Sequence, residues 1–185
     1  MTLLRFTFFD TSVGRCGIVW GERGIVGLQL PESSDEKARS RVTRRFPSAA
    51  ESEPPAEVAK AIESIVALLD GKPTKLSGIA LDMERIGDFE QRVYAIARSI
   101  PPGRTLTYGD IATELGDKLA ARDVGQAMGK NPFPIVVPCH RVVAANGKLG
   151  GFSANGGVRT KLKLLAIEGT LAGSQLGLFE DAASA

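Results

Sequence analysis

The residues with the clearest potential for chemistry are the neighbours Cys139 and His140, set between Pro138 and Arg141. The chain has 185 residues, with one histidine and two cysteines, and chance places the histidine beside a cysteine in only about 2% of such chains. A thiol attacks as its thiolate, but its ordinary pKa of about 8.5 keeps it protonated at neutral pH. A nearby imidazole can take that proton and a guanidinium favours the anion. The sequence therefore predicts nucleophilic chemistry at Cys139.

The segment before this pair raises a geometric objection. Residues 131–138 (NPFPIVVP) hold three prolines, which forbid a helix and predict a rigid extended strap. Neighbouring side chains on an extended chain point to opposite faces. Contact between Cys139 and His140 then needs a turn or a bridging water. The alternative interpretation is a buried cysteine beside a surface histidine.

The composition is that of a soluble globular protein, with 43% hydrophobic and 24% charged residues. Its apolar runs are too short to span a bilayer and its start does not resemble a signal peptide, so we expect no membrane partner and a cytoplasmic location. Two cysteines and one histidine are too few for a disulfide framework or a zinc site. A metal site made of carboxylates alone stays open.

The charge is unevenly distributed along the chain. The formal net charge is only +2, yet residues 92–163 carry 11 Lys and Arg against four Asp and Glu. A polyanionic partner is expected at such a basic stretch. The alternative is a solvated surface whose charge varies at random.

The first half of the chain predicts a small α/β unit. Residues 3–9, 16–20 and 24–30 are β-branched and aromatic runs typical of strands. A helix is expected after Ser34 and another after Pro55, joined by a surface loop over 48–55. Residues 72–86 are predicted to be a connection with one strand near 78–82. No catalytic cluster lies in this half, and Cys16 is expected to be buried.

The second half predicts helices around the Cys139 segment. Asp88 is expected to cap one helix, Thr107 a short one over 108–115, and a third is expected over 118–130 after Gly116. The last two form a helix-turn-helix pattern, which many proteins that never touch DNA also contain. A turn at Asn146-Gly147 and a last helix over 158–167 follow.

Residues 87–169 resemble the catalytic domain of the O6-alkylguanine-DNA alkyltransferases, also called methylated-DNA–protein-cysteine methyltransferases. The matching sequence motifs are IPPGRTLTYGDIA, ARDVGQAM, NPFPIVVPCHRVV, GGFS and KLLAIEG. The first half resembles the family's ribonuclease-H-like α/β domain in outline. The resemblance implies an α/β domain over 1–84, a mainly α winged-helix or helix-turn-helix domain over 85–170, and a tail over 171–185.

The resemblance also implies an activity. Cys139 would accept the alkyl group of O6-alkylguanine, and of O4-alkylthymine, in one irreversible and stoichiometric step. His140 would draw the thiol proton through a water, Glu168 would orient His140, and Asn131 would tie the recognition helix to the strap. No metal or cofactor would be needed. The partner would be double-stranded DNA that holds the lesion, and the protein would act as a monomer.

A base inside a duplex is out of reach of a protein side chain, so proteins of this family bind in the minor groove and flip the target base out of the stack. By position, Arg122 would fill the gap and Tyr108 would help to rotate the nucleotide. Further residues expected at the DNA are Thr107, Ala121, Gly125 and Ala127. Those expected around the flipped base are Tyr108, Met128, Pro134, Arg141, Ser153 and the backbone of Val142.

Several positions depart from the family pattern. Asp123 follows Arg122, where a carboxylate should repel phosphate, Tyr94 replaces a common tryptophan, and Phe152 lacks the hydroxyl of a common tyrosine. Residues 153–157 form a longer loop than the shortest in the family, which leaves the pocket size open. Two other functions are compatible with parts of this pattern. One is a lesion-binding protein without catalysis, which an intact Cys139 disfavours. The other is a cysteine hydrolase, but no glycine motif that could form an oxyanion hole lies beside the cysteine.

Overall fold

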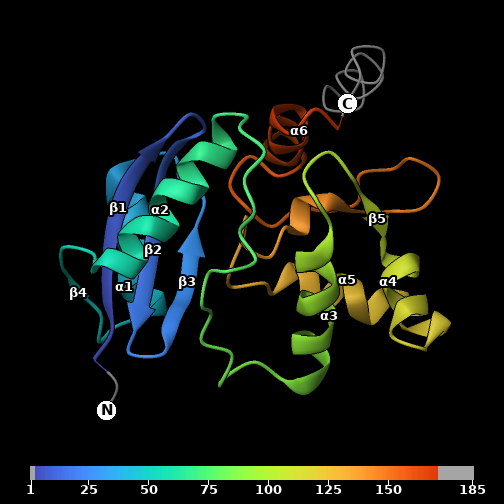
Figure 1. Cartoon of the computed structure of the whole chain (residues 1–185), viewed down its shortest axis with the longest axis horizontal. Coiled ribbons are helices and arrows are strands. Elements are labelled where there is room, and N and C mark those ends of the chain that lie inside the picture. Colours follow the sequence, from blue (N-terminus) through green and yellow to red (C-terminus); the bar gives the residue numbers. More distant parts are fainter. Residues whose placement is uncertain (1–2, 171–185) are drawn as a thin grey trace.

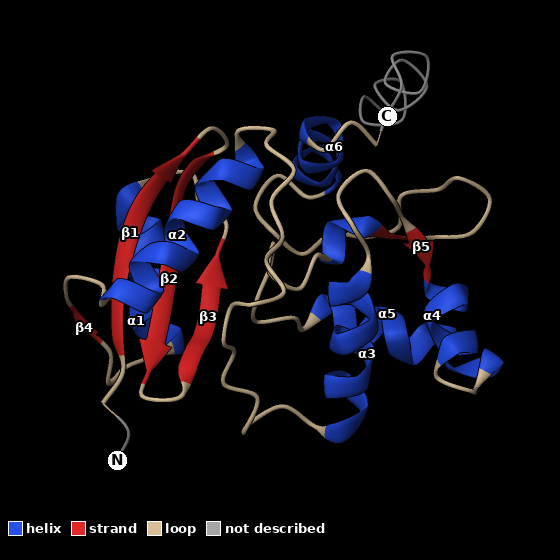
Figure 2. Ribbon diagram, viewed as in Figure 1, coloured by secondary structure: helices blue, strands red, loops and turns tan. Residues whose placement is uncertain are grey.

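The computed structural model describes residues 3–170, so the predicted tail over 171–185 lies outside the described residues. Within this part, Figure 1 shows a sheet with helices on both faces, formed by the first half of the chain, beside a mainly helical second half. Figure 2 shows how unevenly the strands are shared between the two halves.

The first half is built on a four-stranded sheet in the order β3-β2-β1-β4. Strands β1 (Arg5–Thr11), β2 (Gly14–Gly21) and β3 (Gly24–Gln29) form an antiparallel meander, which confirms the three predicted strands to within two residues. The short β4 (Ala50–Glu51) pairs in parallel with the start of β1. The sequence predicted a loop there. β4 is a strand only because it pairs with the free edge of β1, which is distant in the sequence, and no local pattern reveals that pairing.

Alternation along β2 divides the side chains between two helices on opposite faces of the sheet. Val19 packs against Val42 of α1 (Asp35–Arg45), whereas Ile18 belongs to the cluster that holds Ile65 of α2 (Ala56–Leu69). In Figure 1, α2 lies in front of the sheet and α1 behind it. The hydroxyl of Ser34 caps α1 by accepting a hydrogen bond from the Lys37 backbone N–H at 3.3 Å, as predicted.

The connection over residues 72–86 crosses between the halves without forming a strand. The expected strand near 78–82 is wrong, since only Leu81 makes a single bridge, to Ile25 of β3. Two backbone hydrogen bonds join Ile25 to Ala80 and Asp82. The segment is also held by Arg98, whose guanidinium donates to the carbonyls of Leu76, Ser77 and Ile79 at 2.9–3.2 Å. Side-chain bonds of this kind come from a distant helix, so the local sequence does not reveal them.

The second half places four helices around the Cys139 segment: α3 (Asp88–Ser99), α4 (Tyr108–Glu114), α5 (Ala121–Gly129) and α6 (Val158–Ile167). Two corrections concern helix starts. Gly87, not Asp88, is the N-cap of α3, and the residues before α5 form a separate 3₁₀ helix, Lys118–Ala120. The expected cap at Thr107 is confirmed as a reciprocal capping box with Asp110.

A short parallel pair, β5 (Leu106–Thr107) and β6 (Val142–Val143), links the start of α4 to the residues after Cys139. Tyr94, noted above as a departure from the family pattern, joins α3 to α5 because its buried hydroxyl donates to the Ala127 carbonyl at 3.0 Å. Both contacts fix α4 and α5 relative to Cys139.

The two halves share one buried core, which runs from Ile18 and Leu28 in the sheet to Val93 and Val124 in the helices. The outer edge of β3 is also covered: the Leu28 N–H donates to the Pro132 carbonyl at 2.8 Å. An unpaired strand edge is thereby closed, and the segment that leads to Cys139 is bonded directly to the sheet. In residues 3–170, no helix is long and apolar enough to cross a membrane.

Candidate active site around Cys139

The segment before Cys139 is a folded loop, and the predicted extended strap is wrong. The Val137 N–H donates to the Phe133 carbonyl at 2.8 Å. The Asn131 side chain closes the same loop, donating to the Val137 carbonyl at 2.8 Å and accepting from the Phe133 N–H at 2.9 Å. Ile135 sits at the tip with a φ of 76°. This is a strained conformation for a β-branched residue, and its burial to 2% exposure holds it in place.

Cys139 begins a 3₁₀ turn, Cys139–Arg141. The turn answers the geometric objection, because side chains that follow one another on a 3₁₀ helix do not point to opposite faces as they do on a strand. Cys139 is half-buried and free, whereas His140 is only 1% exposed. The alternative of a buried cysteine beside a surface histidine is therefore wrong for this chain.

Glu168, at the end of α6, binds both residues that follow Cys139. Its Oε1 lies 2.8 Å from Nε2 of His140 and accepts from Nη2 of Arg141 at 2.7 Å, while its Oε2 accepts from Nε of Arg141 at 2.9 Å. The Nη1 of Arg141 donates to the Ile100 carbonyl at 2.6 Å. A carboxylate at Glu168 requires the proton of the imidazole on Nε2, so Nδ1 carries the free lone pair. That buried Nδ1 has no hydrogen-bond partner among the described residues.

The pKa shifts agree with this assignment. Burial raises the pKa of Glu168, but hydrogen bonds from His140 and Arg141 outweigh it and bring the value to about 2. Burial lowers the pKa of His140 in spite of Glu168, which keeps the imidazole neutral. Burial also raises the pKa of the Cys139 thiol, against the opposite effects of Asn131 and Lys161. At neutral pH the site therefore combines a protonated thiol with a neutral base.

Lys161 is a site residue that the sequence did not single out. It is fully buried, and its Nζ donates to the carbonyls of Val142 and Leu149 at 2.6 and 2.7 Å. The ammonium also lies 6.0 Å from the ring centroids of Tyr108 and Phe152. Burial lowers its pKa to about 8, partly offset by Cys139. A lysine within an amphipathic helix is normally solvated, so no local signal marked it.

A cavity of about 610 Å³ opens between α5, Cys139 and the loop before α6. It brings together the predicted residues Tyr108, Ala121, Arg122, Gly125, Met128, Cys139 and Ser153. Tyr108 fits there because a Cβ at Gly150, where φ is +73°, would lie 2.9 Å from the tyrosine hydroxyl. Arg122 is exposed at the rim. Asp123, in the first turn of α5, is not among the lining residues.

Five of the residues predicted at the DNA or around the flipped base do not line this cavity, and one of them, Pro134, lines a smaller neighbouring cavity. Ala127 is only 1% exposed and packs in the core, so its side chain faces the protein interior. Arg141 is bound to Glu168 and does not line the cavity, and Val142 is buried with its carbonyl accepting from Lys161. The Thr107 hydroxyl accepts the capping hydrogen bond of α4. Burial and hydrogen bonding fix these positions, and the spacing of residues in the sequence does not predict either of them.

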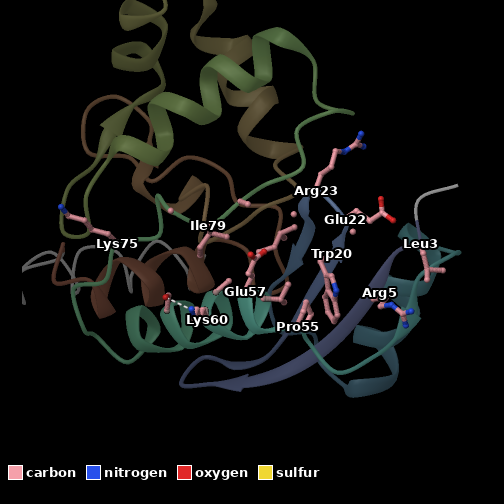
Figure 3. A pocket seen from close by; sticks show the side chains of 18 residues that line it. Leu3, Arg5, Trp20, Glu22, Arg23, Pro55, Glu57, Lys60, Lys75 and Ile79 are labelled. Carbon is pink, nitrogen blue, oxygen red and sulfur yellow. Dashed lines mark hydrogen bonds between the residues drawn. The ribbon is translucent and has the colours of Figure 1, made fainter.

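A larger cavity, of about 820 Å³, lies on the other side of the sheet domain, between the β2–β3 turn, α2 and the connection. Figure 3 shows Trp20 inside it and Arg23 and Lys75 at its edges. None of the predicted site residues lines it. The second thiol of the chain is no rival nucleophile either, since burial raises the pKa of Cys16 to about 12. Cys139 is thus the thiol that borders a cavity.

Residues 88–170 match the family model described as 6-O-methylguanine DNA methyltransferase, DNA binding domain. A methylated-DNA–protein-cysteine methyltransferase of Mycolicibacterium paratuberculosis is 35% identical over 178 residues, covering 96% of this chain and 100% of that protein. One from Methanothermobacter thermautotrophicus is 35% identical over 153 residues, covering 83% and 78%. The crystal structure of Mycobacterium tuberculosis OGT in complex with DNA has a TM-score of 0.71 at 33% identity, covering 95% and 99%.

The pKa of Glu168 predicts a specific acid sensitivity. Because its folded value of about 2 lies below the ordinary 4.5, the ionised carboxylate stabilises the fold above about pH 4.5, and this is lost as the pH falls through about 2. The free energy of unfolding should drop by about 3 kcal/mol between about pH 5 and pH 2 from this group alone. Urea unfolding across that range measures the drop. The Glu168→Gln variant should lack this component, and equal slopes for both proteins would contradict the assignment.

Proposed function

The chain belongs to the methylated-DNA–protein-cysteine methyltransferase family, and on that premise we propose that it repairs DNA by moving the methyl group of O6-methylguanine onto Cys139. The observation that carries the proposal is the position of Cys139, which borders a cavity rimmed by Arg122 on one side and adjoins the buried His140–Glu168 pair on the other. The nucleophile, the residue that accepts its proton and the cavity that could receive a flipped nucleobase are therefore brought together.

The geometry supports a displacement in which His140 acts as the base. With Nε2 held by Glu168, the free Nδ1 lone pair of His140 can accept the Cys139 proton, directly or through a water. Glu168 then stabilises the imidazolium, while the Asn131 side chain and Lys161 favour the thiolate. The sulfur bonds to the methyl carbon as the carbon–O6 bond breaks, and the guanine recovers a proton. The thioether product is stable, so each chain acts once.

The target guanine must leave the duplex to reach Cys139. Helices α4 and α5 serve as a helix-turn-helix in a winged-helix domain, with α5 in the minor groove and the exposed Arg122 in place of the flipped base. Tyr108 lines the cavity that receives this base. Asp123 in the first turn of α5 is favoured by the helix dipole. The sheet half is assigned as a ribonuclease-H-like domain that supports the site.

The charge available for DNA is smaller than the sequence suggests. Of the 11 cationic side chains in residues 92–163, Arg98, Arg141 and Lys161 are engaged with carbonyls or carboxylates inside the protein. Fewer phosphate contacts mean weak binding that depends on salt, which suits a protein that scans for rare lesions. Repair of O4-alkylthymine, the monomeric state, the cytoplasmic location and independence from cofactors stay predictions.

The central test is the intact mass of the protein after incubation with duplex DNA that holds O6-methylguanine. We expect a gain of one methyl group per chain, located on Cys139 by peptide mapping, and no gain in the Cys139→Ala variant. The Cys16→Ala variant is the matched control and should gain the methyl group normally. Unchanged mass with lesion DNA tightly bound would favour a binding protein without catalysis, and turnover of an ester or peptide would favour a hydrolase.

Arg122 offers a test of base flipping. The Arg122→Ala variant should repair duplex DNA at least about tenfold more slowly, because the gap in the stack is left unfilled. Its reaction with the free base O6-methylguanine needs no flipping and should stay within about twofold of the original rate. Arg159→Ala, which removes an exposed cation on α6, is the control. Equal slowing of both reactions by Arg122→Ala would overturn this role.

A further inference from the structure

A second, smaller cavity borders Cys139 on the side of the sheet domain. Its volume is about 60 Å³, and it shares Met128, Cys139, Phe152 and Ser153 with the cavity of about 610 Å³. Asn131, Pro134 and Ala154 of the helical half also line it. The sheet domain supplies the other wall through Leu28, Gln29, Leu30, Glu32, Arg41 and Arg45. We name this space the side cavity.

The chemistry of the transfer says which part of a lesion would lie there. The sulfur attacks the alkyl carbon from the side opposite to O6, so the sulfur, carbon and oxygen are in line. Any substituent on that carbon must then project sideways from the line. A guanine is too large for about 60 Å³ and, of the two cavities that border Cys139, fits only the one of about 610 Å³. The side cavity, which also borders the sulfur, has room for a substituent of a few non-hydrogen atoms.

The rim of the side cavity has an excess of positive charge. Arg41 donates to Glu32 at 2.8 Å, so these two charges offset one another. Arg45 has no ion pair among the described residues, and its guanidinium carbon lies 5.1 Å from the ring centroid of Phe46. Partial burial and the nearby Arg41 lower the pKa of Arg45.

We propose that the side cavity receives the substituent of the O6-alkyl group and that Arg45 favours lesions whose substituent is a carboxylate, of the O6-carboxymethylguanine type. The inference rests on the proposed function and names a substrate class for it. In the step, Sγ of Cys139 bonds to the methylene carbon, the carbon–O6 bond breaks, and its electron pair stays with the guanine. The thiol loses one proton to His140 and the guanine N1 gains one, so charge and atoms balance.

A pair of lesions that differ only in charge tests this proposal. Single-turnover repair rates are measured for duplexes that hold O6-carboxymethylguanine or the neutral O6-carbamoylmethylguanine, whose substituents are nearly equal in size. We expect the lesion with the carboxylate to react about fivefold faster than the neutral lesion, because a partly screened charge pair with Arg45 contributes about 1 kcal/mol. In Arg45→Gln the ratio of the two rates should fall to about one. Using a ratio within each variant cancels any general loss of activity.

Arg44→Gln is the matched control, because Arg44 and Arg45 are exposed neighbours on α1 and only Arg45 lines the side cavity. It should keep the fivefold ratio. An unchanged ratio in Arg45→Gln, or equal rates for the two lesions in the original protein, would overturn the proposal. Failure of the proposed function itself looks different, since no methyl group would then reach Cys139 from O6-methylguanine.

Discussion

The carboxylate of Glu168 is the group on which the rest of the site depends. It is almost fully buried and joins His140 to Arg141, while Arg141 also holds the Ile100 carbonyl after α3. Buried charges are costly unless each one is paired and hydrogen-bonded, so this arrangement is stable only when the 3₁₀ turn, α6 and the end of α3 meet. The same contacts set the tautomer of His140. Packing and reactivity are therefore fixed by one set of hydrogen bonds.

The sheet domain contributes to the site more directly than a separate scaffold would. The edge of β3 is bonded to Pro132, and the loop closed by Asn131 leads from there to the strained Ile135 and on to Cys139. A strained residue is retained where its surroundings hold it firmly. Residues of β3 and α1 also form one wall of the side cavity. Changes in the first half of the chain can thus alter chemistry at Cys139.

The cationic side chains of the second half also have roles that depend on tertiary contacts. The basic stretch in the second half indicates a polyanionic partner, yet part of its charge serves the protein itself. Arg98 holds the connection between the halves, Arg141 neutralises Glu168, and Lys161 lies buried beside Tyr108. Side chains of one type therefore act as a clamp, a counter-ion and a buried donor. Only their tertiary contacts distinguish these roles.

The sequence alone determined the main elements, because strand alternation, helical periodicity and caps such as Ser34 and Thr107 are local properties. It also singled out Cys139 and His140, since their adjacency in a chain with one histidine is visible without a structure. It could not predict β4, the folded loop before Cys139 or the burial of Lys161 and Ala127. β4 and Lys161 depend on partners far away in the chain, namely the edge of β1 and the carbonyl of Val142, whereas the loop before Cys139 is closed by a side-chain amide whose role the residue pattern does not reveal. The tertiary structure decided them because only folding brings those partners within hydrogen-bonding or packing distance.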